Sequence, residues 1–140
     1  MTVTLERFAT RWIAIALVYF VAAVSLGIFM AASEDFRLRG LHVHLNLLGW
    51  VSMALFGIVY RLFPRVAATR LAALHFWLYQ LALPPMMAGL AGLLLGHAAM
   101  VPLVAAGSVA VGVAIALFAV GFWRAVGASA VGFQQLKAPA

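Results

Sequence analysis

The sequence predicts an all-α membrane protein with four transmembrane helices, and composition is the first reason. Of the 140 residues, 67% are hydrophobic and only 9% are charged, a balance that soluble domains of this size do not show. The uncharged stretches are also long enough, because a helix needs about 20 mainly apolar residues to cross a bilayer. Helices are expected because the backbone polar groups of a lipid-exposed segment must be satisfied within that segment.

The helices follow from the uncharged stretches in chain order. Trp12–Ser33 has 22 such residues, and Gly40–Tyr60 has 21. The third stretch, Leu71–Trp123, has 53 residues and is long enough for two helices. Gly96 and Pro102 mark the turn between these two, because both residue types interrupt helices. We therefore expect a single domain over residues 1–140 with helices at 8–33, 41–62, 71–96 and 102–124, followed by a short cytoplasmic tail from residue 127.

Basic residues predict the orientation of the chain. With both termini inside, the inner side carries seven basic side chains and the outer side carries two, as the positive-inside rule requires. The seven are Arg7, Arg11, Arg61, Arg65, Arg70, Arg124 and Lys137, and the two are Arg37 and Arg39. The net charge of +6 indicates contact with anionic membrane lipid, whereas the basic stripe of a nucleic-acid-binding domain is missing. Abundant Arg and Ala favour a bacterial inner membrane, in which this would be a multi-pass protein.

His42 and His44 are the strongest functional signal. Ionisable side chains are costly in a bilayer and mark a function by default, and imidazole is a ligand of metals and haem iron. Helical residues two apart are rotated by about 200°, so each ring should face a different cleft, cofactor or subunit. On the face of His42, Asn46 could orient the imidazole and Gly49 could leave room for a flat macrocycle. The alternative is that the pair lies at the water interface and only caps the helix.

Two further histidines are candidate metal ligands. His97 shares the outer side with the pair, where it could cover a cofactor or join a copper site between subunits; otherwise it is a loop histidine. His75 lies about 33 Å from His97 along the helix at 1.5 Å per residue, so the two cannot share a site within one subunit. The alternative for His75 is an anchor at the inner membrane interface.

The segment His42-Val43-His44-Leu45-Asn46-Leu47-Leu48-Gly49-Trp50 resembles the His-x-His segment of subunit I of the haem-copper oxidase superfamily. Weaker support comes from Tyr60-Arg61-Leu62-Phe63-Pro64 and from the predicted topology. The resemblance implies a fold like one four-helix arc of that subunit, so that three copies of this chain would form a homotrimer. It also implies that the two histidines face two different haems.

The sequence departs from that family in its other functional residues. It has no adjacent His-His pair, which the oxidases use in binding copper, and no Glu or Lys inside an expected span. Oxygen reduction and proton pumping are therefore not implied, and oxidoreductase activity stays an open question. The absence of Cys excludes covalent c-type haem attachment and Cys-ligated iron–sulfur clusters.

These observations favour a protein that binds b-type haem through His42 and His44 near the outer face, with copper as a further candidate. Electron transfer with a redox partner is favoured over gas sensing, because two histidine ligands leave the iron no open position. The alternative is a small transporter or structural subunit without a cofactor. Exporters of this size usually need a membrane-embedded carboxylate to couple protons, and this chain has none in its expected spans.

Overall fold

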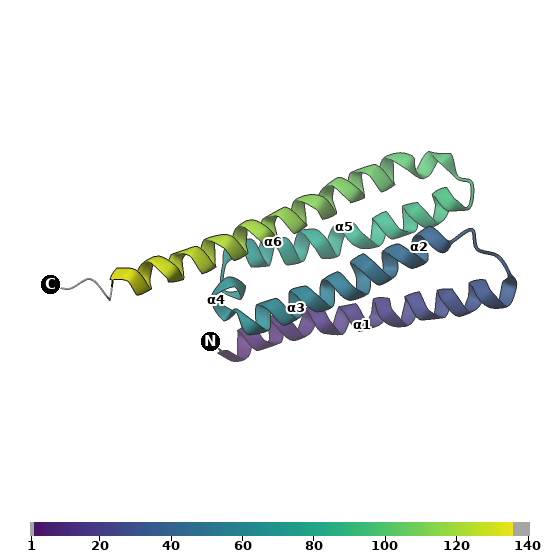
Figure 1. Ribbon diagram of the computed structural model, residues 1–140. Coiled ribbons are helices and arrows are strands. Elements are labelled where there is room, and N and C mark those ends of the chain that lie inside the picture. The colour runs from purple at the N-terminus through teal and green to yellow at the C-terminus, as the bar shows by residue number, and fades with distance from the viewer. Residues whose placement is uncertain (1, 136–140) are drawn as a thin grey trace.

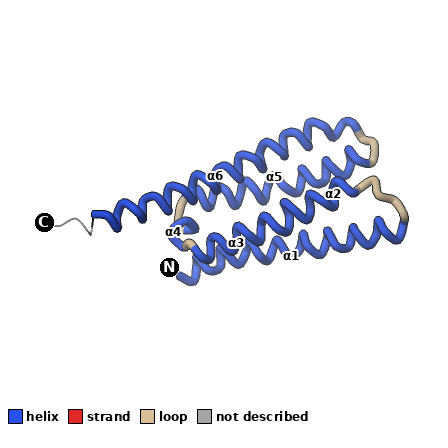
Figure 2. Tube along the Cα trace, in the orientation of Figure 1, coloured by secondary structure: helices blue, strands red, loops and turns tan. Residues whose placement is uncertain are grey.

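The computed structural model describes residues 2–135, with side-chain positions for residues 5–127, and this part of the chain is entirely helical apart from its connections (Figures 1 and 2). Four helical segments are long and apolar enough to cross a membrane, which confirms the predicted class. The elements in chain order are α1 (Thr2–Ser33), α2 (Arg39–His44), the π-helix η1 (Leu45–Ser52), α3 (Met53–Leu62), α4 (Pro64–Ala67), α5 (Arg70–Leu94), the 3₁₀-helix η2 (Ala98–Met100) and α6 (Val101–Gln135).

The four spans form two antiparallel hairpins. The continuous segment α2–η1–α3 packs along α1, and α5 packs along α6. The loop between α1 and α2 and the turn between α5 and α6 lie at one end of the molecule (Figure 1). This end carries His42, His44 and His97, and we call it the histidine end. The opposite end holds the start of α1 and the connection through α4; we call it the arginine end because it carries Arg7, Arg11, Arg61, Arg65, Arg70 and Arg124.

The last helix is longer than the expected range 102–124, because α6 continues to Gln135. The segment that follows Arg124 contains several Ala residues and no Pro before Pro139. Ala is the best helix former, so nothing in this segment stops the helix that begins at Val101. The last five residues of the expected tail lie outside the described part of the chain.

The turn between α5 and α6 forms where the sequence predicts it. Gly96 has a φ of 98°, a left-handed conformation that glycine adopts without steric cost. The N–H of His97 donates to the Gly92 carbonyl at 2.9 Å, and the N–H of Gly96 donates to the Leu93 carbonyl at 3.0 Å. These two bonds make a Schellman motif, which satisfies carbonyls at the end of α5 and reverses the chain.

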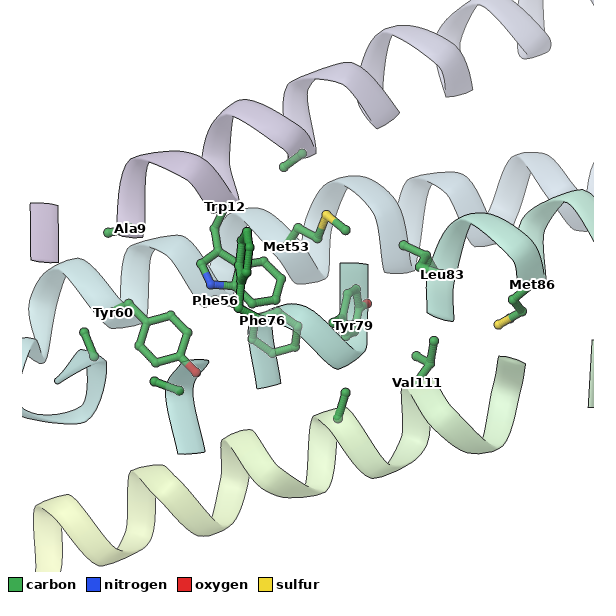
Figure 3. Packing of buried hydrophobic residues seen from close by; sticks show 14 of the residues in the cluster. Ala9, Trp12, Met53, Phe56, Tyr60, Phe76, Tyr79, Leu83, Met86 and Val111 are labelled. Carbon is green, nitrogen blue, oxygen red and sulfur yellow. The ribbon is translucent and has the colours of Figure 1, made fainter. Parts of the chain in front are cut away.

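All four spans meet in an aromatic cluster toward the arginine end, part of which is drawn in Figure 3. Trp12 of α1 is fully buried and lies with its ring centroid 5.3 Å from Phe56 of α3 and 5.6 Å from Tyr79 of α5. Phe118 of α6 completes the cluster, 4.7 Å from Phe56. Aromatic pairs of this kind stabilise by about 0.5–1.5 kcal/mol each beyond the area they bury. The cluster therefore holds the two hairpins together.

The contact between α1 and α3 depends on a glycine. A Cβ atom at Gly57 would lie 2.6 Å from Cγ1 of Ile13 and 3.0 Å from the carbonyl oxygen of Ala9. The carbonyl belongs to the backbone of α1, so the helices themselves would have to separate. Small residues at helix crossings are common in membranes because they allow such close approach.

Gly57→Ala is therefore expected to destabilise the protein by about 1–3 kcal/mol, the usual cost of overpacking a tight core. Gly112→Ala is the matched control, because a Cβ atom there meets nothing within 4 Å. The measurement is the free energy of unfolding of each variant in detergent. Equal stability of the two variants would contradict the close contact.

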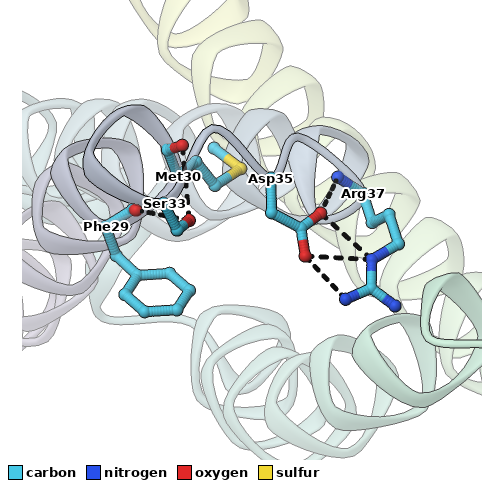
Figure 4. A network of polar contacts seen from close by, with 5 residues as sticks. All are labelled: Phe29, Met30, Ser33, Asp35 and Arg37. Carbon is cyan, nitrogen blue, oxygen red and sulfur yellow. Dashed lines mark hydrogen bonds and ion pairs between the residues drawn. The ribbon is translucent and has the colours of Figure 1, made fainter.

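The loop between α1 and α2 is held by short polar contacts, shown in Figure 4. The Ser33 hydroxyl donates to the Phe29 carbonyl at 2.8 Å. The Arg37 guanidinium donates to both carboxylate oxygens of Asp35: Nε lies 3.0 Å from each oxygen, and Nη2 lies 2.6 Å from Oδ2. These hydrogen bonds and the Arg37 backbone N–H lower the pKa of the Asp35 carboxyl to about 2. The loop lies outside the candidate spans, so its charges face water or headgroups.

We expect the Asp35 carboxyl to titrate near pH 2 and the Arg37→Gln variant to move this midpoint toward the ordinary value of 3.8. The depressed pKa means that the ion pair holds the loop above the ordinary pKa and that this contribution is lost as pH falls through about 2. Carboxyl chemical shifts in the protein labelled with ¹³C at aspartate give the midpoint. An unchanged midpoint in the variant would show that Arg37 is not the cause.

Candidate histidine site

His42 lies on α2 and reaches across to α1. Its Nδ1 atom is 2.9 Å from the carbonyl oxygen of Ala23. The ring packs over Gly27, where a Cβ atom would lie 2.9 Å from Cε1 of the imidazole. Ala23 and Gly27 are one turn apart on α1, and their small size lets the ring approach the backbone of that helix. His42 therefore links the two helices of the first hairpin.

His44 makes the same kind of bond within its own helix. Its Nδ1 atom is 2.8 Å from the carbonyl oxygen of Gly40, one turn earlier. Farther along the helix from His44, Leu48 is half-buried, whereas Val51 and Leu55 are exposed. The two imidazoles thus use different partners, His42 on α1 and His44 on α2 itself. Neither caps the helix, because both bond to carbonyl oxygens and the start of α2 has no side-chain cap.

These bonds fix which ring nitrogen carries the proton. A carbonyl oxygen can only accept, so Nδ1 must be the donor in both His42 and His44. In the neutral imidazole, Nε2 then carries the free lone pair. Histidines that ligate metals usually donate their other ring N–H to a carbonyl or a carboxylate, which sets the tautomer and the orientation of the ring. Both rings have this arrangement.

Asn46 lies beside His42, as the helical spacing predicts. Its amide nitrogen donates to the His42 carbonyl at 2.9 Å and lies 3.4 Å from Nε2 of the His42 ring. The second distance is long for a hydrogen bond. The Asn46 amide therefore lies next to Nε2 of His42, but its main hydrogen bond is to the backbone.

Gly49 does not provide the space that we expected for a macrocycle. It is buried against α1, where a Cβ atom would lie 2.5 Å from Cδ1 of Tyr19. The tyrosine ring of the same chain fills the room that the glycine leaves. Gly49 thus serves the packing of η1 on α1, and any large group at His42 must approach from another side.

The chain from Leu45 to Ser52 forms a π-helix, directly after His44. The Tyr79 hydroxyl of α5 donates to the carbonyl of Leu48, within this segment, at 3.0 Å. Such segments are rare and occur often at functional sites. Nothing in the sequence predicts it, because the apolar pattern of a π-helix in lipid looks like that of an α-helix.

His97 is exposed in the turn between α5 and α6, where its backbone forms part of the Schellman motif. Its position matches the alternative of a loop histidine. Within the described part of the chain, no three His, Cys, Asp or Glu side chains lie close enough together to hold a metal ion. His97 is thus not grouped with two other side chains of these types in the described residues.

His75 differs from the expected interfacial anchor, because it is fully buried. Its ring stacks on Trp12 with centroids 4.7 Å apart, and its Nδ1 atom lies 2.8 Å from the Tyr60 hydroxyl. The other ring nitrogen and the Trp12 indole nitrogen are buried without a hydrogen-bond partner. The signal for this was present in the sequence: Ala72, Phe76 and Tyr79 share the buried face of α5 with His75 at helical spacing.

Comparisons of the sequence with protein-family models, curated proteins and solved structures found no match. The chain is a four-helix protein of the multi-pass membrane type, and its function has to be argued from the geometry of its own residues.

The hydrogen bond between Tyr60 and His75 allows a test of the buried cluster. We expect Tyr60→Phe to cost about 1–3 kcal/mol of unfolding free energy, because it leaves a buried ring nitrogen without a partner. Combining it with His75→Leu should cost less than the sum of the two single changes. In the double variant both polar groups of the pair are gone, so neither is left buried without its partner. Tyr19→Phe is the matched control, since no hydrogen bond of the Tyr19 hydroxyl occurs in the described structure. Additive effects of the two changes would contradict the pairing.

Proposed function

We propose that this protein binds b-type haem through His42 and His44 at the histidine end and transfers electrons. The observation that supports this most is that both rings have the same tautomer and the same kind of hydrogen-bond partner. In each, Nδ1–H is held by a backbone carbonyl, at 2.9 Å for His42 and 2.8 Å for His44. This leaves Nε2 as the atom able to ligate iron. A haem held there would supply an iron that gains and loses one electron.

The positions of the two rings favour sites shared between copies of the chain. His42 bonds to the backbone of α1, and His44 bonds within α2. Because the rings have partners on different helices, we do not expect both to bind one iron inside a single subunit. Tyr19 also occupies the space over Gly49. A haem between His42 of one subunit and His44 of the next would use both, and three copies would give three equivalent sites. This homotrimer is the arrangement that the resemblance to the haem-copper oxidases implies.

Within this proposal the residues of the chain have separate tasks. Gly40 and Ala23 offer the carbonyls that orient the rings, and Gly27 allows the His42 ring to lie against α1. Asn46 is 3.4 Å from Nε2 of His42, so its amide must give way when that nitrogen takes a ligand. Electron transfer is favoured over gas binding because two histidine ligands complete the coordination of the iron.

A structural subunit without a cofactor is the second candidate. It is favoured by the bond from His42 to Ala23, which joins α2 to α1 directly. On this view the histidine serves as a polar contact between helices, a known use of polar side chains in membranes.

The test is the optical spectrum and haem content of the purified protein in detergent. We expect a Soret band with sharp reduced α and β bands, close to one haem per chain, and no change on adding carbon monoxide to the reduced protein. His42→Ala and His44→Ala should each lose the haem, because each shared iron needs both rings. His97→Ala is the matched control and should keep it, because His97 is exposed in a turn.

Other outcomes separate the candidates. A colourless preparation after growth with ample haem would favour the structural subunit. Full six-coordinate haem in either His42→Ala or His44→Ala would overturn the shared site.

A further inference from the structure

The start of α1 presents two arginines without an acidic partner. Arg7 and Arg11 are exposed and lie one turn apart. Like charges at this spacing repel each other. The nearby carboxylate of Glu6 is 2.8 Å from the Arg61 guanidinium and is thus engaged elsewhere. Neither Arg7 nor Arg11 forms an ion pair with any residue in the described part of the chain. The pair is therefore suited to an anion from outside the protein.

The two arginines line a shallow groove on α1. Glu6, Thr10 and Ala14 also line it, and the Glu6 carboxylate is the one that is paired with Arg61. The groove holds about 480 Å³, which is more than a phosphate group needs. Ala14, one turn farther along the helix than Thr10, is the lining residue nearest the apolar middle of α1.

The same face of α1 continues as an exposed apolar stripe. Val18, Val21 and Ile28 follow Arg7 and Arg11 at spacings that keep them on one side of the helix, and they are 68%, 64% and 66% exposed. From Arg11 to Val21 the helix rises about 15 Å, which is half the thickness of the hydrocarbon core. A phospholipid in one leaflet could thus place its anionic headgroup near the two arginines and an acyl chain along the apolar stripe of the same helix face.

We propose that α1 binds one anionic phospholipid, with its phosphate between Arg7 and Arg11 and an acyl chain over Val18 and Val21. Inorganic phosphate shares the chemistry of the head, but it would gain nothing from the apolar stripe. The site lies at the arginine end, so it does not depend on the haem proposal. It also does not depend on which side of the membrane that end faces.

The experiment measures lipid retained by the full chain in detergent by native mass spectrometry, with phosphatidylglycerol and phosphatidylcholine as the probes. We expect the protein to prefer phosphatidylglycerol and to hold one such lipid per chain. Arg7→Gln with Arg11→Gln should weaken phosphatidylglycerol binding roughly thirtyfold, as expected for the loss of two surface arginines. The matched control is Arg70→Gln with Arg124→Gln, which removes the same charge at the same end and should change binding by less than about threefold.

Two further measurements test whether the bound anion is a lipid and whether it binds in the groove. Inorganic phosphate at the same concentration should not displace the lipid, and Ala14→Phe should weaken phosphatidylglycerol binding without any change of charge. Equal losses in the two double variants would overturn the site in favour of a general charge effect. Displacement by inorganic phosphate, or unchanged binding in Ala14→Phe, would overturn the lipid as the occupant.

Discussion

The bilayer core offers no water to polar groups, and this constraint determines how the polar side chains of the bundle are placed. Because no water is available there, a polar atom in a span can be satisfied only by a partner on the protein. His42 bonds to the Ala23 carbonyl, Tyr60 bonds to His75, and Tyr79 reaches the Leu48 carbonyl of the π-helix. Each of these bonds joins different helices. The same requirement that makes the chain helical therefore also ties the helices together through their few polar groups.

The two ends of the molecule carry different chemistry. The histidine end has two imidazoles whose Nδ1 atoms are bonded to carbonyls, which leaves a lone pair on each Nε2. The arginine end has a surplus of guanidinium groups, of which Arg61 is neutralised by Glu6. Between them lies the aromatic cluster around Trp12. The redox role proposed for one end and the lipid binding proposed for the other would thus rest on different residues, and both can be tested in the same purified protein.

The buried His75 adds a polar group that neither proposal uses. It lies among aromatic rings from all four spans, with one ring nitrogen on Tyr60 and the other without a partner. Buried polar atoms without a partner are rare in native proteins, because each costs about 1–3 kcal/mol. The aromatic contacts of the cluster must offset this free-energy cost. His75 and Trp12 are thus held in place by packing more than by polar bonding.

The helical class and the four spans could be predicted from the chain because length and hydropathy decide what can cross a bilayer, and the turn at Gly96 could be predicted because glycine interrupts helices. The sequence also placed Asn46 beside His42, since helical spacing is local. It could not determine the π-helix, the burial of His75 under Trp12 or the filling of the space over Gly49 by Tyr19. These depend on which face of one helix meets which face of another. In a span that is apolar on every side, only the packing of the whole bundle decides this.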